Sequence, residues 1–190
     1  MTATRDNILQ SANELYREYG YRGTSMQQII KRSGAAAGSV YHHFPGGKEE
    51  IAAAALTNSG ASYQVLVQAV LTASPNLASG IAALFKSGAK VLQETNYLDP
   101  CPVGTVAREI ASSNPELRDV SHQVLKRWVD AAANLISNEV DEPGRANDFA
   151  VLLVAAIEGG FLLSRTARSP EPMLAIGRSL VASLEEDYVA

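Results

Sequence analysis

The sequence predicts an all-α protein of about nine helices, and three observations lead to that prediction. Apolar residues recur at intervals of three and four along most of the 190-residue chain, which is the spacing of one helix face. Proline, glycine and asparagine interrupt the pattern at short intervals, as they do between helices. No segment alternates apolar and polar residues over the length of a strand, and the sequence has no internal repeat.

The first two predicted helices carry clear capping signals. Residues 4–19 place apolar side chains along one stripe, and Gly20 suits the left-handed position that ends a helix. A second helix over residues 25–33 opens with Ser25 and Gln28, which have the spacing of a capping box. In this motif the serine hydroxyl accepts a backbone N–H, and the glutamine side chain reaches back to the helix start.

A tight turn joins the second helix to a third one, over residues 35–43. Gly34 enters the strained conformation of such a turn at little cost, because it has no Cβ. The third helix has small residues on one side and ends in Tyr-His-His-Phe. Two short helices joined in this way form a helix-turn-helix, whose second helix typically lies in the major groove of DNA.

Six further helices are expected beyond the glycine-rich residues 45–47. They cover residues 48–72, 77–94, 105–111, 114–138, 145–168 and 171–188. The breaks between them hold proline, glycine or asparagine, at residues 74–76, 96–104, 141–144 and 169–170.

Composition places the chain among ordinary globular proteins. Hydrophobic residues make up 46% and charged residues 19% of the sequence, which excludes a disordered chain. The single cysteine, Cys101, excludes an internal disulfide framework and fits a reducing compartment. The amino-terminal residues are charged where a secretory signal would be apolar. The longest apolar run, residues 149–163, is interrupted by Glu158 and falls short of the ~20 residues of a membrane span. We therefore expect a cytoplasmic protein with no membrane partner.

Charge is distributed unevenly along the chain. The whole sequence carries a net charge of −4, which would repel DNA. Residues 1–48 hold six basic and three acidic residues, giving +3, and residues 49–190 hold ten basic and seventeen acidic residues, giving −7. This asymmetry is expected when only one small part of a protein meets phosphate groups.

A series of residues in the first quarter of the chain has the order and spacing of one family of regulators. These residues are Ile8, Ala12, Leu15, Tyr16, Gly20, Tyr21, Thr24, Ser25, Ile29, Gly34, Ser39, Val40, Tyr41, His43, Phe44, Lys48, Glu49 and Ile51. Through them, residues 5–51 resemble the DNA-binding domain of the TetR (tetracycline-repressor) family of bacterial transcriptional regulators. Beyond this region the chain agrees with the family only in the number and length of its helices.

The resemblance implies two domains. A helix-turn-helix DNA-binding domain would cover residues 1–47, and a helical bundle that binds an effector and dimerises would cover residues 48–190. Tyr41, His42 and His43 match family positions that commonly touch phosphate, to which phenol and imidazole groups donate well. Lys48 and the free N–H groups that open its helix would favour the same anion.

Other residues of the two short helices would contact the groove. Ser25 and Gln27 can hold the DNA backbone beside it. Base reading falls to Ala36, Ala37, Gly38 and Ser39. Two of these can touch thymine methyl groups, and Ser39 can donate or accept a hydrogen bond. Because this surface has few long donors, we expect part of the specificity to come from DNA shape.

Two departures from the family pattern affect DNA binding. The family often has lysine where this chain has Ala37, so one phosphate contact is missing. The turn after Phe44 is one residue longer than its commonest form, which leaves the aim of the Lys48 ammonium open.

Metal, cofactor and nucleotide-phosphate sites are not expected. His42 and His43 point about 100° apart on a helix, so they do not converge on one metal ion. His43 is equally readable as a half-buried structural residue. Gly47 and Lys48 do not form a P-loop, because that motif needs glycine at the position of His42 and serine or threonine at that of Glu49.

Two helices of the second half are candidates for a dimer interface. Residues 149–163 are apolar almost all round, which predicts burial on several faces. The last helix carries Met173, Leu174, Ile176, Gly177, Leu180, Val181 and Leu184 at helical spacing. Two such helices from each of two subunits would form a four-helix interface, as in the proteins that this chain resembles. A monomer with these helices in its own core is the alternative.

A ligand pocket is implied by the family, with candidate residues Phe85, Tyr97, Cys101, Trp128, Glu158 and Phe161. Each aromatic residue also suits plain core packing. Glu158 lies amid apolar neighbours, and a buried carboxylate needs a partner. It either binds a polar group of the ligand or pairs at the dimer interface with a donor such as Arg165. Cys101 is also a candidate redox sensor, although no second cysteine is present to resolve an oxidised thiol.

These features together predict a homodimeric repressor that leaves a palindromic DNA operator when a small-molecule inducer of unknown identity binds. Activation in place of repression would depend on the position of the operator. The alternatives from other classes are a small helical ligand-binding protein or enzyme without DNA binding, and a protein-interaction module. The sequence lacks the paired nucleophile and base, the metal-ligand cluster and the phosphate-binding loop of an enzyme site, so no catalytic residue is expected.

Overall fold

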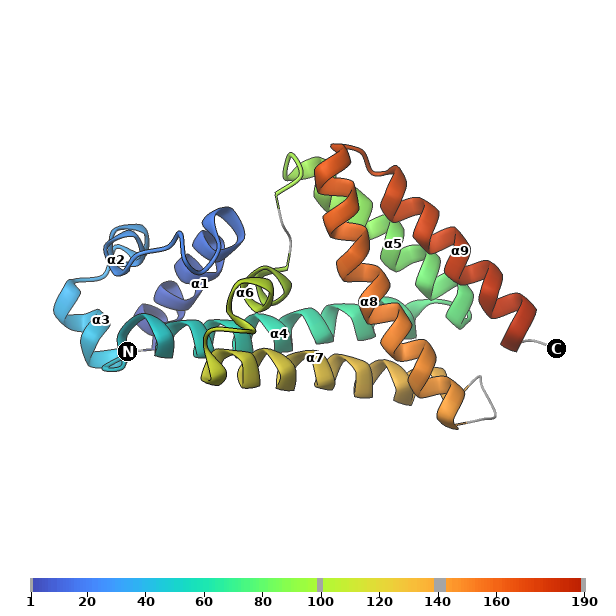
Figure 1. The fold of residues 1–190 in the computed structure, drawn as a ribbon, viewed down its shortest axis with the longest axis horizontal. Helices are drawn as coiled ribbons and strands as arrows, with labels where there is room; N and C mark the ends of the chain where they lie inside the picture. Colours follow the sequence, from blue (N-terminus) through green and yellow to red (C-terminus); the bar gives the residue numbers. More distant parts are fainter. Residues whose placement is uncertain (1, 99–100, 139–142, 189–190) are drawn as a thin grey trace. The chain divides into compact units, whose positions relative to one another are not determined.

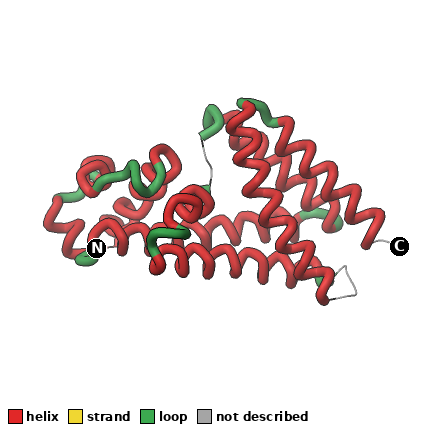
Figure 2. Tube along the Cα trace, in the orientation of Figure 1, coloured by secondary structure: helices red, strands yellow, loops and turns green. Residues whose placement is uncertain are grey.

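The computed structural model describes residues 2–98, 101–138 and 143–188, and the regular structure in these ranges is entirely α-helical (Figure 2). The helices are α1 (Thr2–Tyr19), α2 (Met26–Ser33), α3 (Ala37–His43), α4 (Gly47–Ala73), α5 (Leu77–Glu94), α6 (Pro102–Ile110), α7 (Pro115–Ile136), α8 (Pro143–Ala167) and α9 (Glu171–Tyr188) (Figure 1). The all-α prediction is confirmed. Of the predicted turn at residues 141–144, residues 141 and 142 lie outside the described ranges.

Helix α6 begins earlier than the sequence predicts. The two prolines of this region favour a loop up to residue 104, whereas the helix starts at Pro102. Cys101 caps it, because its Sγ accepts the backbone N–H of Gly104 at 3.3 Å. Pro102 occupies the first turn, where a missing N–H costs nothing.

The chain forms two compact units, each assembled from two stretches of sequence. The first unit comprises residues 1–62 and 101–124, and the second comprises residues 63–100 and 125–190. Helices α4 and α7 therefore contribute residues to both units. These units follow packing, whereas the predicted boundary between residues 47 and 48 concerns DNA and effector binding and stays a prediction.

In the first unit, α1 packs against α2, α3 and α6. The buried apolar side chains include Ile8, Leu9, Leu15, Tyr16, Ile29, Val40, Phe44, Ile51 and Leu56. The Thr24 hydroxyl is also buried and donates to the carbonyl of Gly20 at 2.8 Å, which fixes the turn between α1 and α2. Val40 and Phe44 anchor α3 in this core, as the sequence predicts, and the remaining α3 side chains are wholly or partly exposed.

In the second unit, α5, α8 and α9 pack side by side (Figure 1). Gly177 allows α9 to approach α5 closely, since a Cβ at this position would lie 2.6 Å from the Cβ of Phe85. A Cβ on Gly160 of α8 would lie 2.7 Å from the Met173 Sδ atom, so this glycine serves the α8–α9 contact in the same way. The Ser164 hydroxyl accepts the backbone N–H of Met173 at 3.0 Å.

Helix α8 is apolar over most of its length, yet one of its faces is exposed. An 18-residue window within Gly144–Ala167 has a mean hydropathy of 1.6, so this helix is long and apolar enough to cross a membrane by length and composition alone. Helix α8 packs against α5 and α9, and 33% of this window is buried. The sequence predicts burial on several faces, but Val151, Leu152, Leu162 and Leu163 are 43–52% exposed and share one face. A contiguous apolar face of this kind is typical of a protein interface.

Candidate DNA-binding surface and ligand pocket

Helices α2 and α3 have the local geometry that the sequence predicts. The Ser25 Oγ accepts the N–H of Gln28 at 3.2 Å, and the Gln28 Oε1 accepts the N–H of Ser25 at 2.7 Å. This is a complete capping box at the start of α2. Gly34 ends α2 in the left-handed region, with φ of 66°. Both capping predictions are confirmed, and the left-handed backbone of Gly34 turns the chain from α2 toward α3.

The residues predicted to contact DNA are accessible. Ser25, Gln27, Ala36, Ala37, Gly38, Tyr41 and His42 are exposed, and Ser39, His43 and Lys48 are partly buried. Tyr41 is 50% exposed although it is a large aromatic residue at the end of α3. A Cβ added to Gly38 would meet no atom within 4 Å, so the first turn of α3 is open. Accessibility is what contact with a DNA groove requires, and the individual contacts stay predictions.

The two histidines at the end of α3 differ in exposure. Their ring centroids lie 5.5 Å apart with the planes inclined by 65°. His42 is exposed and His43 is partly buried, so His42 is better placed for a phosphate group. Within the described residues, no group of three or more histidine, cysteine, aspartate and glutamate side chains is arranged to hold a metal ion.

Lys48 lies in the first turn of α4, against an aromatic ring. It follows Gly47, whose φ of 67° is left-handed. The Lys48 Nζ atom lies 4.1 Å from the centre of the Tyr21 ring. Burial lowers the pKa of Lys48, while the carboxylate of Glu109 on α6 acts in the opposite direction. The sequence leaves open where the Lys48 ammonium points. In the structure it points toward the Tyr21 ring, and a cation–π contact favours this arrangement.

Arg32 is engaged in ion pairs within the first unit. Its guanidinium donates to the Glu18 carboxylate at 2.5 and 2.9 Å and lies 3.9 Å from that of Glu14. This contact lowers the pKa of Glu18. The neighbouring Lys31 is exposed. Of the basic residues behind the net charge of +3, Arg32 therefore holds α2 to α1, whereas Lys31 faces solvent.

Side chains from α6 and from the turn between α6 and α7 hold the residues on either side of the helix-turn-helix. The Glu109 carboxylate accepts the backbone N–H of Arg22 at 2.8 Å, and the Arg22 guanidinium donates to the Ser113 hydroxyl at 3.0 Å. The Asn114 amide donates to the Glu49 carboxylate, and the Asn114 Oδ1 caps α7. Asn114 and its following proline signal a helix start in the sequence, but no local signal names Glu49 as a partner.

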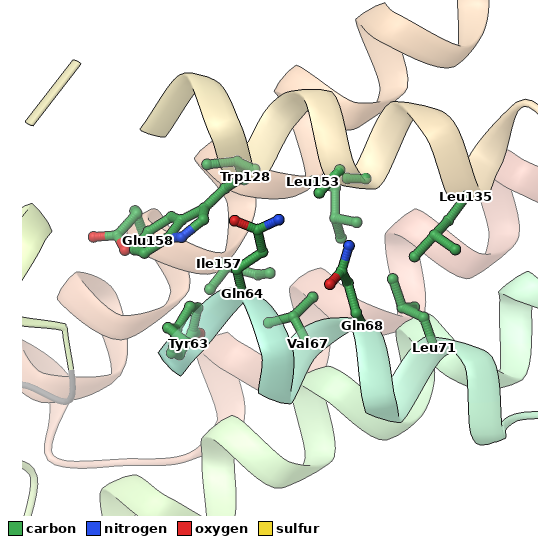
Figure 3. A pocket seen from close by; sticks show the side chains of 13 residues that line it. Tyr63, Gln64, Val67, Gln68, Leu71, Trp128, Leu135, Leu153, Ile157 and Glu158 are labelled. Atoms are coloured by element: carbon green, nitrogen blue, oxygen red, sulfur yellow. The ribbon is translucent and has the colours of Figure 1, made fainter. Parts of the chain in front are cut away.

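The second unit contains a small cavity lined by α4, α7 and α8 (Figure 3). Its volume is about 30 Å³, which is room for about one water molecule. Its lining is mostly apolar and comprises Tyr63, Gln64, Val67, Gln68, Leu71, Trp128, Ala131, Ala132, Leu135, Leu153, Val154, Ile157 and Glu158. Tyr63 and Trp128 form an aromatic pair with ring centroids 5.0 Å apart. Figure 3 shows Glu158 at the same end of the cavity as this pair, with Leu71 and Leu135 at the other end.

Two of the six predicted ligand-binding residues line this cavity, namely Trp128 and Glu158. Phe161 is buried against α5, since a Cβ on Gly88 would lie 3.3 Å from its ring. Phe85 is also buried and borders a separate groove between α5 and α9.

The other two candidates lie outside the cavity lining. The Tyr97 carbonyl accepts the Nε–H of Arg165 at 3.2 Å, and the Arg168 guanidinium lies 5.3 Å from the Tyr97 ring. Cys101 caps α6 in the first unit. The sequence reasoning missed Tyr63, Gln64 and Gln68, although two amides one turn apart in an apolar helix were a usable signal.

Two family models match the chain. Residues 8–55 match the model of bacterial regulatory proteins of the tetR family, and residues 78–179 match that of the transcriptional regulator LmrA/YxaF-like C-terminal domain. The HTH-type transcriptional regulator LmrA of Bacillus subtilis (strain 168) is 35% identical over 173 residues, covering 91% of this chain and 92% of LmrA. The uncharacterized HTH-type transcriptional regulator YxaF of the same bacterium is 34% identical over 177 residues, with 93% of both chains covered.

Solved structures share the fold at lower identity. The regulatory protein TetR from Rhodobacter sphaeroides has a TM-score of 0.82 at 18% identity, over 93% of this chain and 96% of that one. The reduced form of NemR from E. coli has a TM-score of 0.81 at 20% identity, over 93% and 94% of the two chains. The helix-turn-helix motif, the fold and the identity to LmrA over most of its length agree: the chain belongs to the TetR family of HTH-type transcriptional regulators.

Proposed function

We propose that this regulator is a cytoplasmic homodimeric repressor that binds a palindromic operator and leaves it when a small molecule binds. The observation that carries the proposal is the capped α2–α3 pair. Val40 and Phe44 hold α3 in the core, while Gln27, Tyr41 and His42 are exposed around it. No catalytic step is part of the proposal, and residues 1–47 are its DNA-binding domain.

The proposed operator contacts divide into two kinds. Ser25, Gln27, Tyr41, His42 and His43 hold phosphate groups, together with Lys48 once its ammonium leaves the Tyr21 ring. Ala36, Ala37, Gly38 and Ser39 meet the base edges. The small size of these four side chains supports close approach of the α3 backbone to the groove floor.

The exposed apolar face of α8 supports the homodimer. The exposed side chains along it are those of Val151, Leu152, Leu162 and Leu163. A second copy of the chain, related to the first by a two-fold axis, would bury them. Two recognition helices related by such an axis contact half-sites about 34 Å apart, one turn of DNA. The palindromic operator follows from this symmetry.

The α4–α7–α8 cavity is the proposed inducer site. It combines an aromatic pair, two amides and one carboxylate within apolar walls, which suits an apolar molecule with a few polar groups. At about 30 Å³ the cavity has to enlarge to admit such a molecule. An inducer that prefers the enlarged state would shift the population of conformations away from the one that binds the operator.

The test begins with selection of genomic DNA by the purified protein at two salt concentrations. We expect enrichment of one palindrome, with affinity falling steeply as salt rises, because phosphate contacts release counterions. Tyr41→Phe and Gln27→Ala should weaken binding to the selected sequence, and Gln93→Ala, an exposed residue of α5, should not. Selection of no palindrome, or variants that bind as tightly as the parent protein, would contradict the proposal.

The inducer site is tested separately with Trp128, the single tryptophan of the chain. A compound that releases the operator should change the Trp128 emission at the same concentration. Ala131→Phe should fill the cavity, preserve operator binding and abolish release. Release that survives this substitution would place the inducer elsewhere.

A further inference from the structure

A second hollow of the second unit is an open groove between α5 and α9, which lie side by side in Figure 1. Its volume is about 790 Å³, within the range of small-molecule binding sites. The residues that line it are Ala82, Phe85, Lys86, Ala89, Lys90, Gln93, Pro170, Leu174, Gly177, Arg178, Val181 and Ala182. It shares no residue with the cavity around Trp128.

The floor of the groove is apolar and made of small side chains. Gly177 brings the backbone of α9 close to Phe85, and Ala89 beside them is buried. Leu174 and Val181 are partly exposed on the α9 wall. Such a floor accepts a narrow hydrocarbon chain, whose burial is favourable in proportion to the apolar area removed from water.

The charged residues of the lining are all basic. Lys86 and Lys90 are one turn apart on α5 and therefore on one side of that helix, and Arg178 comes from α9 across the groove. Residues 49–190 carry a net charge of −7, so a groove with three cations and no acidic lining residue is a local exception. This charge pattern is complementary to an anion.

The carboxylates that meet these cations leave them accessible. Glu94 lies 3.6 Å from Lys90, with the two side chains 61% and 73% exposed. Glu171 lies 2.5 Å from Arg178, with exposures of 63% and 64%. Ion pairs this exposed contribute little to stability. A ligand carboxylate can therefore take the place of Glu94 or Glu171 at small cost.

We propose that the α5–α9 groove binds an amphipathic carboxylate with an unbranched hydrocarbon body. The hydrocarbon lies on the floor formed by Ala89 and Gly177, and the carboxylate is held by Lys86, Lys90 and Arg178. A guanidinium can hold both oxygens of a carboxylate, and the two ammonium groups add further charge-assisted hydrogen bonds. This site is independent of the proposed inducer cavity and of the operator.

The experiment is calorimetric titration of the whole 190-residue chain with decanoate below the concentration at which micelles form. Decyltrimethylammonium and decanol, with the same chain length, are the charge controls. We expect decanoate to bind at least about tenfold more tightly than either, because charge-assisted hydrogen bonds are lost in the controls. Equal affinity for decanoate and decyltrimethylammonium would overturn the proposal.

Variants test the groove itself. Lys86→Glu and Arg178→Glu should each weaken decanoate binding about tenfold. Lys126→Glu, an exposed lysine of α7 outside the groove, makes the same change in net charge and should have no effect. Ala182→Phe adds bulk at an exposed position of the groove wall and should block binding without affecting the fold. Decanoate binding that survives both Arg178→Glu and Ala182→Phe would exclude this site.

Trp128 emission separates the groove from the inducer cavity. Because the single tryptophan does not line the groove, 10-bromodecanoate should bind without quenching it. Quenching by one bound equivalent would place the carboxylate in the Trp128 cavity and overturn the proposal. Dissociation of a dimer by Ala182→Phe would also overturn it, since a second copy of the chain would then be what covers the groove.

Discussion

The Glu109 carboxylate of α6 accepts the backbone N–H of Arg22 at 2.8 Å, beside the glycine that ends α1. That glycine, Gly20, has φ of 72°, and a Cβ on it would lie 1.7 Å from the Glu109 Oε1 atom. The Glu109 side chain therefore connects the end of α6 to the turn between α1 and α2. The tetracycline-repressor type of domain thus has support here from a helix 87 residues away in sequence.

Gly20 and Gly34 form a matched pair for measuring this contact. Both have left-handed φ, of 72° and 66°, but only Gly20 has a close neighbour. Gly34→Ala should cost about 1 kcal/mol of unfolding free energy from the backbone alone. Gly20→Ala should cost about 1 kcal/mol more, because Glu109 must move away and lose its hydrogen bond to Arg22. Urea unfolding of both variants measures the difference.

A double variant separates the two costs. In a Glu109→Ala background the hydrogen bond is already absent, so Gly20→Ala should cost no more than Gly34→Ala. If the two single glycine variants are equally stable, the Glu109 side chain adapts freely and the contact does not support the turn.

Ser25 has a capping role in the structure and a predicted role in DNA binding, and one substitution distinguishes them. Aspartate caps helices as well as serine does, so Ser25→Asp should preserve the melting temperature. Its negative charge should weaken operator binding if position 25 lies next to phosphate. Ser25→Ala is the comparison, and it should lower stability by about 1 kcal/mol. Unchanged operator affinity in Ser25→Asp would remove residue 25 from the interface.

Lys48 should add one phosphate contact when the protein binds its operator. A plot of the logarithm of affinity against the logarithm of salt concentration has a negative slope. In Lys48→Gln this slope should become less steep by about 1. Lys126→Gln, which removes an exposed lysine of α7, should leave the slope unchanged. The same slope for Lys48→Gln and the parent protein would mean that the ammonium stays on the Tyr21 ring in the complex.

The exposed face of α8 should be a dimer interface. Leu152→Glu and Leu163→Glu each place a charge on a side chain that is about half exposed, and the desolvation of that charge should dissociate the dimer. Sedimentation measures the mass of the protein in solution and so detects dissociation of the dimer. Operator affinity should fall when the dimer dissociates. Val65→Glu on α4 alters a side chain that is 66% exposed, and it should remain dimeric. Dimers in all three variants would assign the interface to another surface.

The Glu18–Arg32 pair should contribute to stability at neutral pH and lose that contribution in acid. The hydrogen bond from Arg32 lowers the pKa of Glu18 in the folded protein. Its stabilisation is therefore complete above the ordinary glutamate pKa of about 4.3 and disappears as the pH falls through the lowered value. Glu18→Gln should cost no more than about 1 kcal/mol at pH 7, because the Arg32 and Glu18 side chains remain 32% and 28% exposed and solvent screens the pair. Urea unfolding at pH 7 and in acid should show this difference shrinking to zero.

Local signals in the sequence were enough for most helices and for both caps of α2, although not for the start of α6 at Pro102. The limits of α5 and α9 coincide with the predicted spans, and the Ser25–Gln28 capping box and the left-handed Gly34 form as expected. These features depend on residues three or four positions apart, so a single sequence contains their cause. The spacing of residues 5–51 likewise indicated the TetR family from the sequence alone.

Tertiary packing decided what those helices place together. Only the folded chain joins Glu49 to Asn114 and Arg22 to Glu109, and only it directs Lys48 onto Tyr21. These contacts depend on which helix faces meet, and no local pattern records that.

The cavity and the exposed face of α8 also depend on tertiary packing. Trp128 and Glu158 were candidates from the sequence, but Gln64 and Gln68 joined them through the packing of α4 against α7 and α8. The apolar residues of α8 predict burial, yet hydrophobicity does not say whether the chain itself or another molecule covers a given face. The sequence by itself determined most of the helices, the caps of α2 and the family, because these arise from neighbours along the chain. The contacts, the cavity and the open faces were decided by the three-dimensional arrangement of helices, because they arise from residues distant in sequence.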